Sequence, residues 1–175
     1  MTRAFVGIGS NIAPEINVRS AVLRLTETAR VKAISTVYRT EPVGREGQPP
    51  YYNCVVEIET DLAPRDLKFQ LLRRIESELG RTRGIDRFAA RTIDLDLLLY
   101  DDLVMTTEDL TLPDPDIFLR PFLAIPLQEL APGLILPGSG LDISTAVLAQ
   151  PRTGMVPLEN YTERIRKEIL HEREQ

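Results

Sequence analysis

The segment 93–99 alternates apolar and acidic residues in a way that could build a metal site. Asp94 and Asp96 sit between the apolar residues Ile93, Leu95, Leu97 and Leu99. Alternation with a period of two predicts a β-strand, with the apolar side chains on one face and both carboxylates on the other. Because a strand rises about 3.3 Å per residue, the two aspartates are expected about 6–7 Å apart at Cα. Such a pair can hold one divalent cation or share two, and Mg²⁺ prefers oxygen ligands of this kind.

The segment before this strand is rich in arginine, at positions Arg81, Arg83, Arg87 and Arg91. Guanidinium groups stay charged and match phosphate oxygens with two parallel donors. The segment also contains Gly84 and shows no sustained apolar period, so we predict a loop that can close on a ligand. An acid pair beside such a loop fits phosphoryl-transfer chemistry, which depends on positioning and charge neutralisation. The alternative is a solvent-facing strand whose aspartates pair with surface arginines.

The sequence Arg91-Thr-Ile-Asp94-Leu-Asp96-Leu-Leu resembles the signature of the 6-hydroxymethyl-7,8-dihydropterin pyrophosphokinases of folate biosynthesis. The resemblance covers most of the chain up to about Pro137. Its other segments are GIGSN at 7–11, YRTEPVG at 38–44, QPPYYN at 48–53 and RPF at 120–122. It implies an enzyme that transfers the two terminal phosphates of ATP, as one pyrophosphoryl group, to the hydroxymethyl group of the reduced pterin and releases AMP.

The resemblance also implies roles at the phosphate end of the site. Asp94 and Asp96 are expected to hold two magnesium ions. The arginines expected to close over the triphosphate as parts of a flexible catalytic loop are Arg81 and Arg91. The residues that match positions near the nucleotide are Arg83, Arg120 and, on the adenine side, Glu76. For any single arginine the alternative is a structural salt bridge, and for Glu76 it is a solvated position on a helix.

A second set of residues matches the pterin-binding positions of the family. A flat, polar-edged heterocycle needs aromatic faces and a few fixed hydrogen bonds. Tyr51 and Phe122 match the stacking pair, and Asn53 matches the residue whose amide reads the pterin edge. Thr40 and Val43 match positions that contact the ring, Val43 through its main chain. Taken singly, Asn53 could be an ordinary strand residue and Phe122 an ordinary core residue.

The chain departs from the family pattern at two places. Asp114-Pro115 stands where relatives commonly have a histidine followed by proline or tyrosine. A carboxylate near phosphates would repel them unless a cation lies between, so Asp114 is expected to contact a metal or the arginine loop. Phe88 stands where some relatives have a loop tryptophan, which keeps an apolar seal but loses the indole N–H. Neither change is expected to abolish activity.

Hydrophobic periodicity predicts the elements that must position these residues. The expected order is strand 3–8, a helix from Pro14, strand 32–39, strand 52–60, a helix from Pro64 to the stop at Gly80, and the aspartate strand. We interpret Gly7-x-Gly9 as the end of the first strand and the start of a helix rather than as a phosphate cradle. The order predicts an α+β fold with a ferredoxin-like βαββαβ core. Two helices would cover one face of a mostly antiparallel sheet and leave the other face for the site.

The remainder of the chain is expected to extend this core. A short edge strand at 103–105, an interrupted helix within 118–130 and a helical turn at 142–149 should follow. We assign residues 1–150 to the pyrophosphokinase domain and 151–175 to a charged helical tail that is not a separate domain. In the tail, Tyr161, Ile165 and Ile169 recur at helical spacing, so this helix should pack on the body or on a second copy of the chain.

Composition excludes several other classes of protein. The 175 residues suit one domain, and the net charge of −5 argues against a nucleic-acid surface. The single Cys54 offers no disulfide, and the single His171 lies in the charged tail. With no apolar run long enough to span a bilayer and no leader-like start, we expect a cytoplasmic monomer or weak homodimer. The alternatives to catalysis on ATP and the usual pterin are a non-catalytic ligand-binding module on the same scaffold and a pyrophosphokinase for another pterin alcohol.

Overall fold

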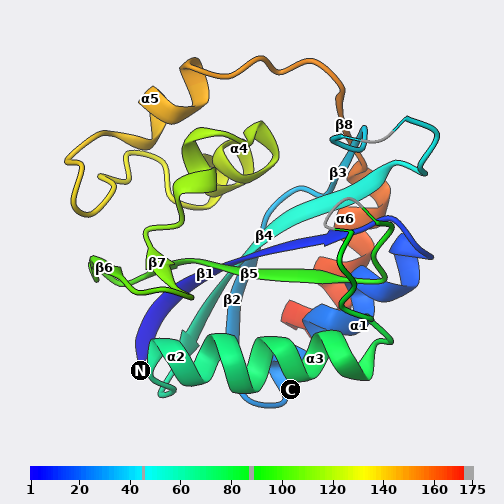
Figure 1. The fold of residues 1–175 in the computed structure, drawn as a ribbon, viewed down its shortest axis with the longest axis horizontal. Coiled ribbons are helices and arrows are strands. Elements are labelled where there is room, and N and C mark those ends of the chain that lie inside the picture. The colour runs from blue at the N-terminus through cyan, green and yellow to red at the C-terminus, as the bar shows by residue number, and fades with distance from the viewer. Residues whose placement is uncertain (45, 87–88, 172–175) are drawn as a thin grey trace.

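An antiparallel sheet runs through the centre of the molecule (Figure 1). The computed structural model describes residues 1–44, 46–86 and 89–171. Within these ranges the strand order is β5-β1-β4-β3-β8, and β2 also pairs with β4. The strands of this sheet are β1 Thr2–Ser10, β2 Arg30–Ile34, β3 Tyr38–Thr40, β4 Tyr51–Thr60, β5 Asp94–Tyr100 and β8 Met155–Pro157. The fold is therefore α+β with a mostly antiparallel sheet, as the sequence predicts.

Helices cover one face of the sheet along its whole length. They are α1 (Pro14–Thr26), the continuous helical run of α2 (Pro64–Asp66), a π-helical segment (67–72) and α3 (Arg73–Glu78), and α6 (Glu159–Arg166). Their apolar stripes pack against Ala4, Val6 and Ile8 of β1 in one core. Gly80, with φ of +83°, follows α3 where a left-handed residue ends a helix at low cost. No helix in the described part of the chain is long and apolar enough to cross a membrane.

A second helical layer lies on the opposite face of the sheet (Figure 1). It contains a 3-10 turn (Pro115–Phe118), α4 (Pro121–Leu130) and α5 (Ile143–Leu148), and it has a core of its own. The expectation that this face is left open is therefore wrong in part. Phe5 and Val55 point to this face and are buried under the layer. The layer leaves open the end of the sheet where β1 carries Gly7 and Gly9, which line a pocket.

The first strand is longer than the sequence pattern indicates. Gly7 and Gly9 do not end it, because β1 continues through them to Ser10 and pairs with both β4 and β5. In β1 every second residue from Phe5 faces the second layer, so both glycines lie on the side that holds the site.

Two other strand boundaries differ from expectation. The predicted strand 32–39 is divided into β2 and β3, and both pair with β4. The edge strand expected at 103–105 is instead the hairpin of β6 (Met105–Thr106) and β7 (Thr111–Leu112), which forms a separate small sheet. The helices predicted within 118–130 and 142–149 are confirmed as α4 and α5.

A bulge alters the alternation of β5 near its end. Phe5 pairs with Leu99, but its neighbour Val6 pairs with Leu97, so Leu98 is the extra residue. Leu95 and Leu97 pack in the first core as predicted, whereas Leu99 joins the second core with Leu98. The prediction that Leu99 shares a face with Leu95 is therefore wrong, because a period of two does not survive an inserted residue.

The C-terminal segment packs on the body of the molecule. Strand β8 pairs with β3, and Tyr161, Ile165 and Ile169 are buried in the first core. The Tyr161 hydroxyl donates to the main-chain oxygen of Glu15 at 2.6 Å, and its ring meets that of Tyr52 edge-on at 5.6 Å. These contacts decide the packing alternative, because the apolar stripe of this helix is covered by its own chain.

Candidate active site

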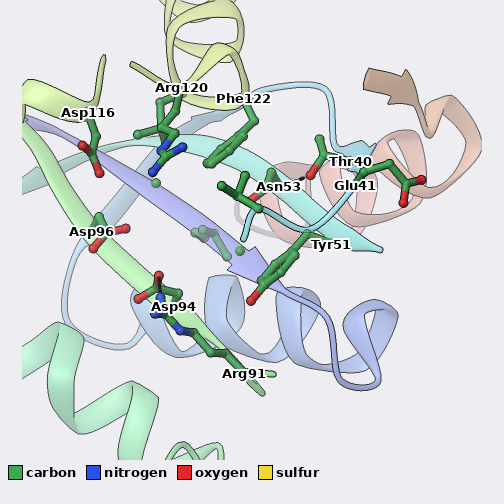
Figure 2. A pocket seen from close by; sticks show the side chains of 15 residues that line it. Thr40, Glu41, Tyr51, Asn53, Arg91, Asp94, Asp96, Asp116, Arg120 and Phe122 are labelled. Carbon is green, nitrogen blue, oxygen red and sulfur yellow. Dashed lines mark hydrogen bonds and ion pairs between the residues drawn. The ribbon is translucent and has the colours of Figure 1, made fainter. Parts of the chain in front are cut away.

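A pocket of about 400 Å³ opens between the end of the sheet and the second helical layer (Figure 2). Its size is within the range of small-molecule sites. Most of the residues singled out in the sequence line it together: Thr40, Val43, Tyr51, Asn53, Arg91, Asp94, Asp96, Arg120 and Phe122. Three more, Glu76, Arg81 and Arg83, form the ion-pair cluster next to Asp94. Segments far apart in the chain thus converge on one site.

The two aspartates project from β5 on the side of the pocket. Their partners in β1 are the glycines, Gly9 opposite Asp94 and Gly7 opposite Asp96, so no β1 side chain covers them. Asp96 has an exposed surface, but it lines the pocket and has protein on several sides. This partial desolvation, together with the negative charge of Asp94 and then of more distant carboxylates, raises the pKa of Asp96 well above its usual value.

This crowding of negative charge suits a divalent cation. Among the residues described there is no group of three side chains able to hold a metal. The pair Asp94 and Asp96 would therefore supply two carboxylates, and the other ligands would come from phosphate oxygens and water, which is the ordinary coordination of Mg²⁺. The donor set fits magnesium bound together with a polyphosphate.

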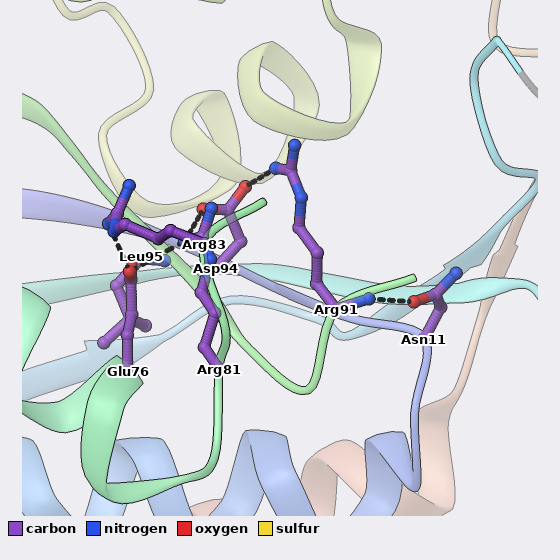
Figure 3. Close-up of polar contacts among 7 residues, drawn as sticks. All are labelled: Asn11, Glu76, Arg81, Arg83, Arg91, Asp94 and Leu95. Carbon is purple, nitrogen blue, oxygen red and sulfur yellow. Dashed lines mark hydrogen bonds and ion pairs between the residues drawn. The ribbon is translucent and has the colours of Figure 1, made fainter. Parts of the chain in front are cut away.

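Both oxygens of Asp94 accept hydrogen bonds from arginines (Figure 3). Arg81 donates from Nη1 to Oδ1 at 2.6 Å, and Arg91 donates from Nη1 to Oδ2 at 2.7 Å. Two guanidinium groups thus already provide positive charge at the carboxylate. A metal ion that binds Asp94 would have to replace these guanidinium groups at the carboxylate. Both groups would then be available to phosphate oxygens.

Glu76 ties the loop to the strand. Its side chain is only 3% exposed, and Oε2 lies 2.7 Å from both Arg81 Nη1 and Arg83 Nη2. Its other oxygen accepts the main-chain N–H of Leu95 at 3.0 Å. Burial raises the pKa of Glu76, against the opposing effects of the Leu95 N–H and the arginines. The alternative of a solvated helix position is therefore wrong.

The far end of the arginine segment is fixed by Asn11. The main-chain N–H of Arg91 donates to Asn11 Oδ1 at 2.8 Å, and the Asn11 N–H donates to the Arg91 oxygen at 3.1 Å. Asn11 Nδ2 donates in turn to Gln48 Oε1 at 3.2 Å. Asn11 of the segment 7–11 thus holds the end of the arginine segment, and Gln48 of the segment 48–53 holds Asn11. The expectations for Arg87 and Phe88 lie outside the described residues.

The opposite end of the pocket carries the aromatic residues. Tyr51 from β4 and Phe122 from α4 point into it from different elements (Figure 2). Between them, Asn53 Nδ2 donates to Thr40 Oγ1 at 2.7 Å, and both residues are buried. Burial raises the pKa of Tyr51, so the phenol stays protonated at neutral pH. Val43 lies at the rim and is half exposed.

Asp114 begins a turn beside the acid pair, and its expected contact with a metal or the arginine loop stays a prediction. Its Oδ1 accepts the main-chain N–H of Asp116 at 2.9 Å and so begins the 3-10 turn. Burial raises the pKa of Asp114, and it is Asp116 that lines the pocket. The lining residues that sequence reasoning missed are Gly7, Ile8, Gly9, Glu41, Asp116 and Leu123. The glycines recur at the strand period, and Ile8 and Glu41 lie in segments that carry the family resemblance.

Comparison with known proteins decides the family. The model of the 7,8-dihydro-6-hydroxymethylpterin-pyrophosphokinase (HPPK) family matches residues 5–132, which contain every residue of the pocket. The chain belongs to this family. Its match ends after α4, so α5, β8 and α6 are additional to the HPPK segment that the family model describes.

Similar HPPK proteins include three bacterial ones named 2-amino-4-hydroxy-6-hydroxymethyldihydropteridine pyrophosphokinase. The Haemophilus influenzae protein is 38% identical over 79% of this chain and 88% of its own. The Bacillus subtilis protein is 42% identical over 73% and 77%. The Pseudomonas aeruginosa protein is 38% identical over 87% and 94%.

Solved structures share the fold. Wild-type HPPK-DHPS of Plasmodium falciparum with pteroate matches 97% of this chain with a TM-score of 0.65. At 13% identity this likeness concerns the fold alone, and the present chain spans 44% of the length of that protein.

Proposed function

We propose that this chain transfers the terminal diphosphoryl group of ATP to the hydroxymethyl oxygen of 6-hydroxymethyl-7,8-dihydropterin in folate biosynthesis. The pterin oxygen forms a bond to the β-phosphorus, and the bond between that phosphorus and the oxygen bridging to the α-phosphorus breaks. AMP leaves with that oxygen, and the hydroxyl proton is lost to solvent. The relatives named as pyrophosphokinases support this proposal.

The observation that carries the proposal is the joint lining of one pocket. Asp94 and Asp96 lie on one wall, and Tyr51, Asn53 and Phe122 lie at the other end. A phosphate chain held at the acid pair would therefore end beside a flat ligand held between the aromatic side chains. Such positioning of two substrates is a large part of catalysis in phosphoryl transfer.

Magnesium ions, two in number, would be held by Asp94 and Asp96. Bound there, they would neutralise charge on the α-, β- and γ-phosphates. Arg81 and Arg91 are proposed as the catalytic arginines, which exchange the Asp94 carboxylate for phosphate oxygens and stabilise the charge that develops on transfer. Glu76 holds β5 and Arg81 in position relative to each other for this exchange.

The other assignments follow the same division of the pocket. On the nucleotide side we propose Glu76, Arg83, Arg91 and Arg120. On the pterin side we propose Tyr51 and Phe122 as stacking residues, and Thr40, Val43 and Asn53 as contacts to the ring edge.

A direct test is incubation with ATP, magnesium and 6-hydroxymethyl-7,8-dihydropterin, followed by chromatography of the nucleotides and the pterins. Equal amounts of AMP and pterin diphosphate are expected. ADP as the nucleotide product, or the absence of pterin diphosphate, would reject the proposal. A module that only binds ligands would release neither product.

The organisation of the molecule carries four further proposals. The βαββαβ unit is proposed to be ferredoxin-like, which its strand order β5-β1-β4-β2 supports. Residues 1–150 are proposed as the pyrophosphokinase domain and 151–175 as its helical extension, supported by the pairing of β8 with β3. The protein is also proposed to be cytoplasmic. It is proposed to act as a monomer or weak homodimer without nucleic-acid or membrane partners.

A further inference from the structure

Gly9 lies directly beside Asn53 in the sheet. The two residues are cross-strand partners of β1 and β4, and both line the pocket. On the other side of β4, Thr40 of β3 accepts a hydrogen bond from Asn53 Nδ2 at 2.7 Å. The Asn53 side chain lies beside Thr40 (Figure 2). Its amide nitrogen is directed to Thr40 and its oxygen lies toward Gly9.

The space that the Asn53 oxygen occupies exists because residue 9 has no side chain. A Cβ at position 9 would lie 2.7 Å from Asn53 Oδ1, closer than such atoms approach in proteins. The other nearby group, the Tyr51 ring, would be in ordinary contact at 3.7 Å. Asn53 is only 7% exposed and is held by Thr40, so its amide has little room to move aside. A methyl group at position 9 would therefore act on one atom, the amide oxygen.

The backbone of Gly9 does not itself require glycine. It is an interior residue of β1 with the extended conformation of a strand, and its φ is outside the left-handed region. Glycine in a strand lowers stability relative to residues with side chains and marks a place where another group approaches closely. Here the group that approaches is the Asn53 amide.

Gly7 offers a comparison in the same strand and on the same face. A Cβ there would lie 3.0 Å from Leu123 Cδ2, the far end of a flexible apolar side chain. That methyl group can rotate away without breaking a hydrogen bond. Both glycines line the pocket. A side chain at position 9 would displace a hydrogen-bonded amide, whereas one at position 7 would displace only an apolar methyl group.

We infer that Gly9 is a specificity-determining position of the pterin end of the pocket: by leaving room for the Asn53 oxygen, it presents a hydrogen-bond acceptor to the edge of the bound ring. The inference rests on the proposed function. With the amide nitrogen committed to Thr40, the oxygen accepts from a ligand that carries N–H donors on its edge, as an aminopyrimidinone ring does. Gly9 is thus a positioning residue that acts through Asn53.

The test is a double-mutant cycle of Gly9→Ala and Asn53→Ala. Binding of 6-hydroxymethylpterin would be followed by the fluorescence of the pterin, which no tryptophan of this chain obscures. Magnesium and α,β-methylene-ATP would be present throughout. Each single variant is expected to weaken pterin binding by about tenfold or more, because a buried polar group loses its partner. The double variant is expected to bind within about twofold of Asn53→Ala, since the methyl group then meets no amide.

Separate measurements distinguish this effect from a general loss of structure. Affinity for the ATP analogue should stay within about twofold of wild type in Gly9→Ala, and Gly7→Ala should weaken pterin binding less than Gly9→Ala does. If Gly9→Ala does not fold, the double variant is expected to fold, because the methyl group then meets no amide oxygen.

Three results would overturn the inference: pterin affinity of Gly9→Ala within twofold of wild type, fully additive losses in the double variant, or failure of both variants to fold. Failure of the wild-type protein to bind the pterin would instead reject the proposed function.

Discussion

The carboxylate of Glu76 accepts a hydrogen bond from the main-chain N–H of Leu95 at 3.0 Å. Leu95 is the residue between the two aspartates of β5. The buried Glu76 of α3 therefore fixes the position of this strand relative to the helix. The other oxygen of the same carboxylate pairs with Arg81 and Arg83. One side chain thus connects the helix, the acid pair and the arginine segment, which are adjacent in the fold but separate in the sequence.

Glu76→Gln removes the negative charge of this residue but keeps the size of its side chain, so it tests the contribution of the charge to stability. The amide can still accept from Leu95, but its NH2 group would face the N–H donors of Arg81 and Arg83 in place of their acceptor. We expect this loss of a buried partner to outweigh the burial cost that raises the pKa of Glu76, so the free energy of unfolding should fall by about 1–3 kcal/mol. Urea unfolding measures this. The matched control is Glu78→Gln in the same helix, whose partly exposed pairs with Arg24 and Arg74 should be worth less than about 1 kcal/mol. Equal losses in the two variants would contradict the central position of Glu76.

Asp94→Asn and Asp96→Asn should each lower kcat by at least about a hundredfold. Even residues that only support metal ligands cost 10–100-fold when they are removed, and these two are proposed as the ligands themselves. Steady-state assays over a range of magnesium concentrations measure the effect. Asp102→Asn is the control, because it is exposed in the turn that follows the same strand and should keep wild-type turnover. Normal metal-dependent turnover in both site variants would contradict the assignment.

Arg91→Met should raise the affinity of the protein for a divalent cation when no nucleotide is present. The guanidinium competes for Oδ2 of Asp94, and loss of a partly exposed ion pair of up to about 1 kcal/mol corresponds to about fivefold tighter binding. Electron paramagnetic resonance of free Mn²⁺ measures this directly. Arg83→Met, which removes a contact to Glu76 instead, should leave the affinity nearly unchanged. Weaker cation binding by Arg91→Met would show that the arginine supports the metal site rather than competing with it.

Asp96→Asn should make the ligand-free protein more stable at neutral pH. The pKa of Asp96 is raised in the folded state, chiefly by desolvation and then by the charge of Asp94, above the value of about 3.9 for an unfolded chain. Between these two pKa values the folded protein binds a proton that the unfolded protein does not, so stability falls as the pH rises through that window.

Asparagine cannot ionise, so the variant escapes this loss. The difference in the free energy of unfolding between the variant and wild type should therefore grow from acid to neutral pH. A variant that is less stable than wild type at pH 7 would contradict the proposed crowding of charge. A variant that gains stability and loses activity is common when the replaced residue belongs to an active site whose charges destabilise the fold.

Much of this arrangement could be predicted from the sequence because local patterns determine it. The alternation around Asp94 and Asp96 predicts a strand with both acids on one face, and β5 has this arrangement. The stripe of Tyr161, Ile165 and Ile169 predicts a packed helix, and all three are buried. In each case the spacing of a few neighbouring residues carries the information.

Contacts between distant segments were harder to predict. Nothing near Glu76 in the sequence indicates that it is buried, because its partners come from the following loop and from β5. The bulge at Leu98 depends on pairing with β1, and the role of Asp114 depends on the 3-10 turn that it begins. Gly9 looked like a strand end because the pattern of β1 does not reveal which side chain of β4 needs the space.

The most direct test of the account is a crystal structure with magnesium, α,β-methylene-ATP and 6-hydroxymethylpterin. We predict cations bound by the carboxylates of Asp94 and Asp96, with Arg81 and Arg91 moved from Asp94 to phosphate oxygens. The pterin ring should lie between Tyr51 and Phe122. Carboxylates turned to bulk solvent with no cation beside them, and a nucleotide bound elsewhere, would contradict it.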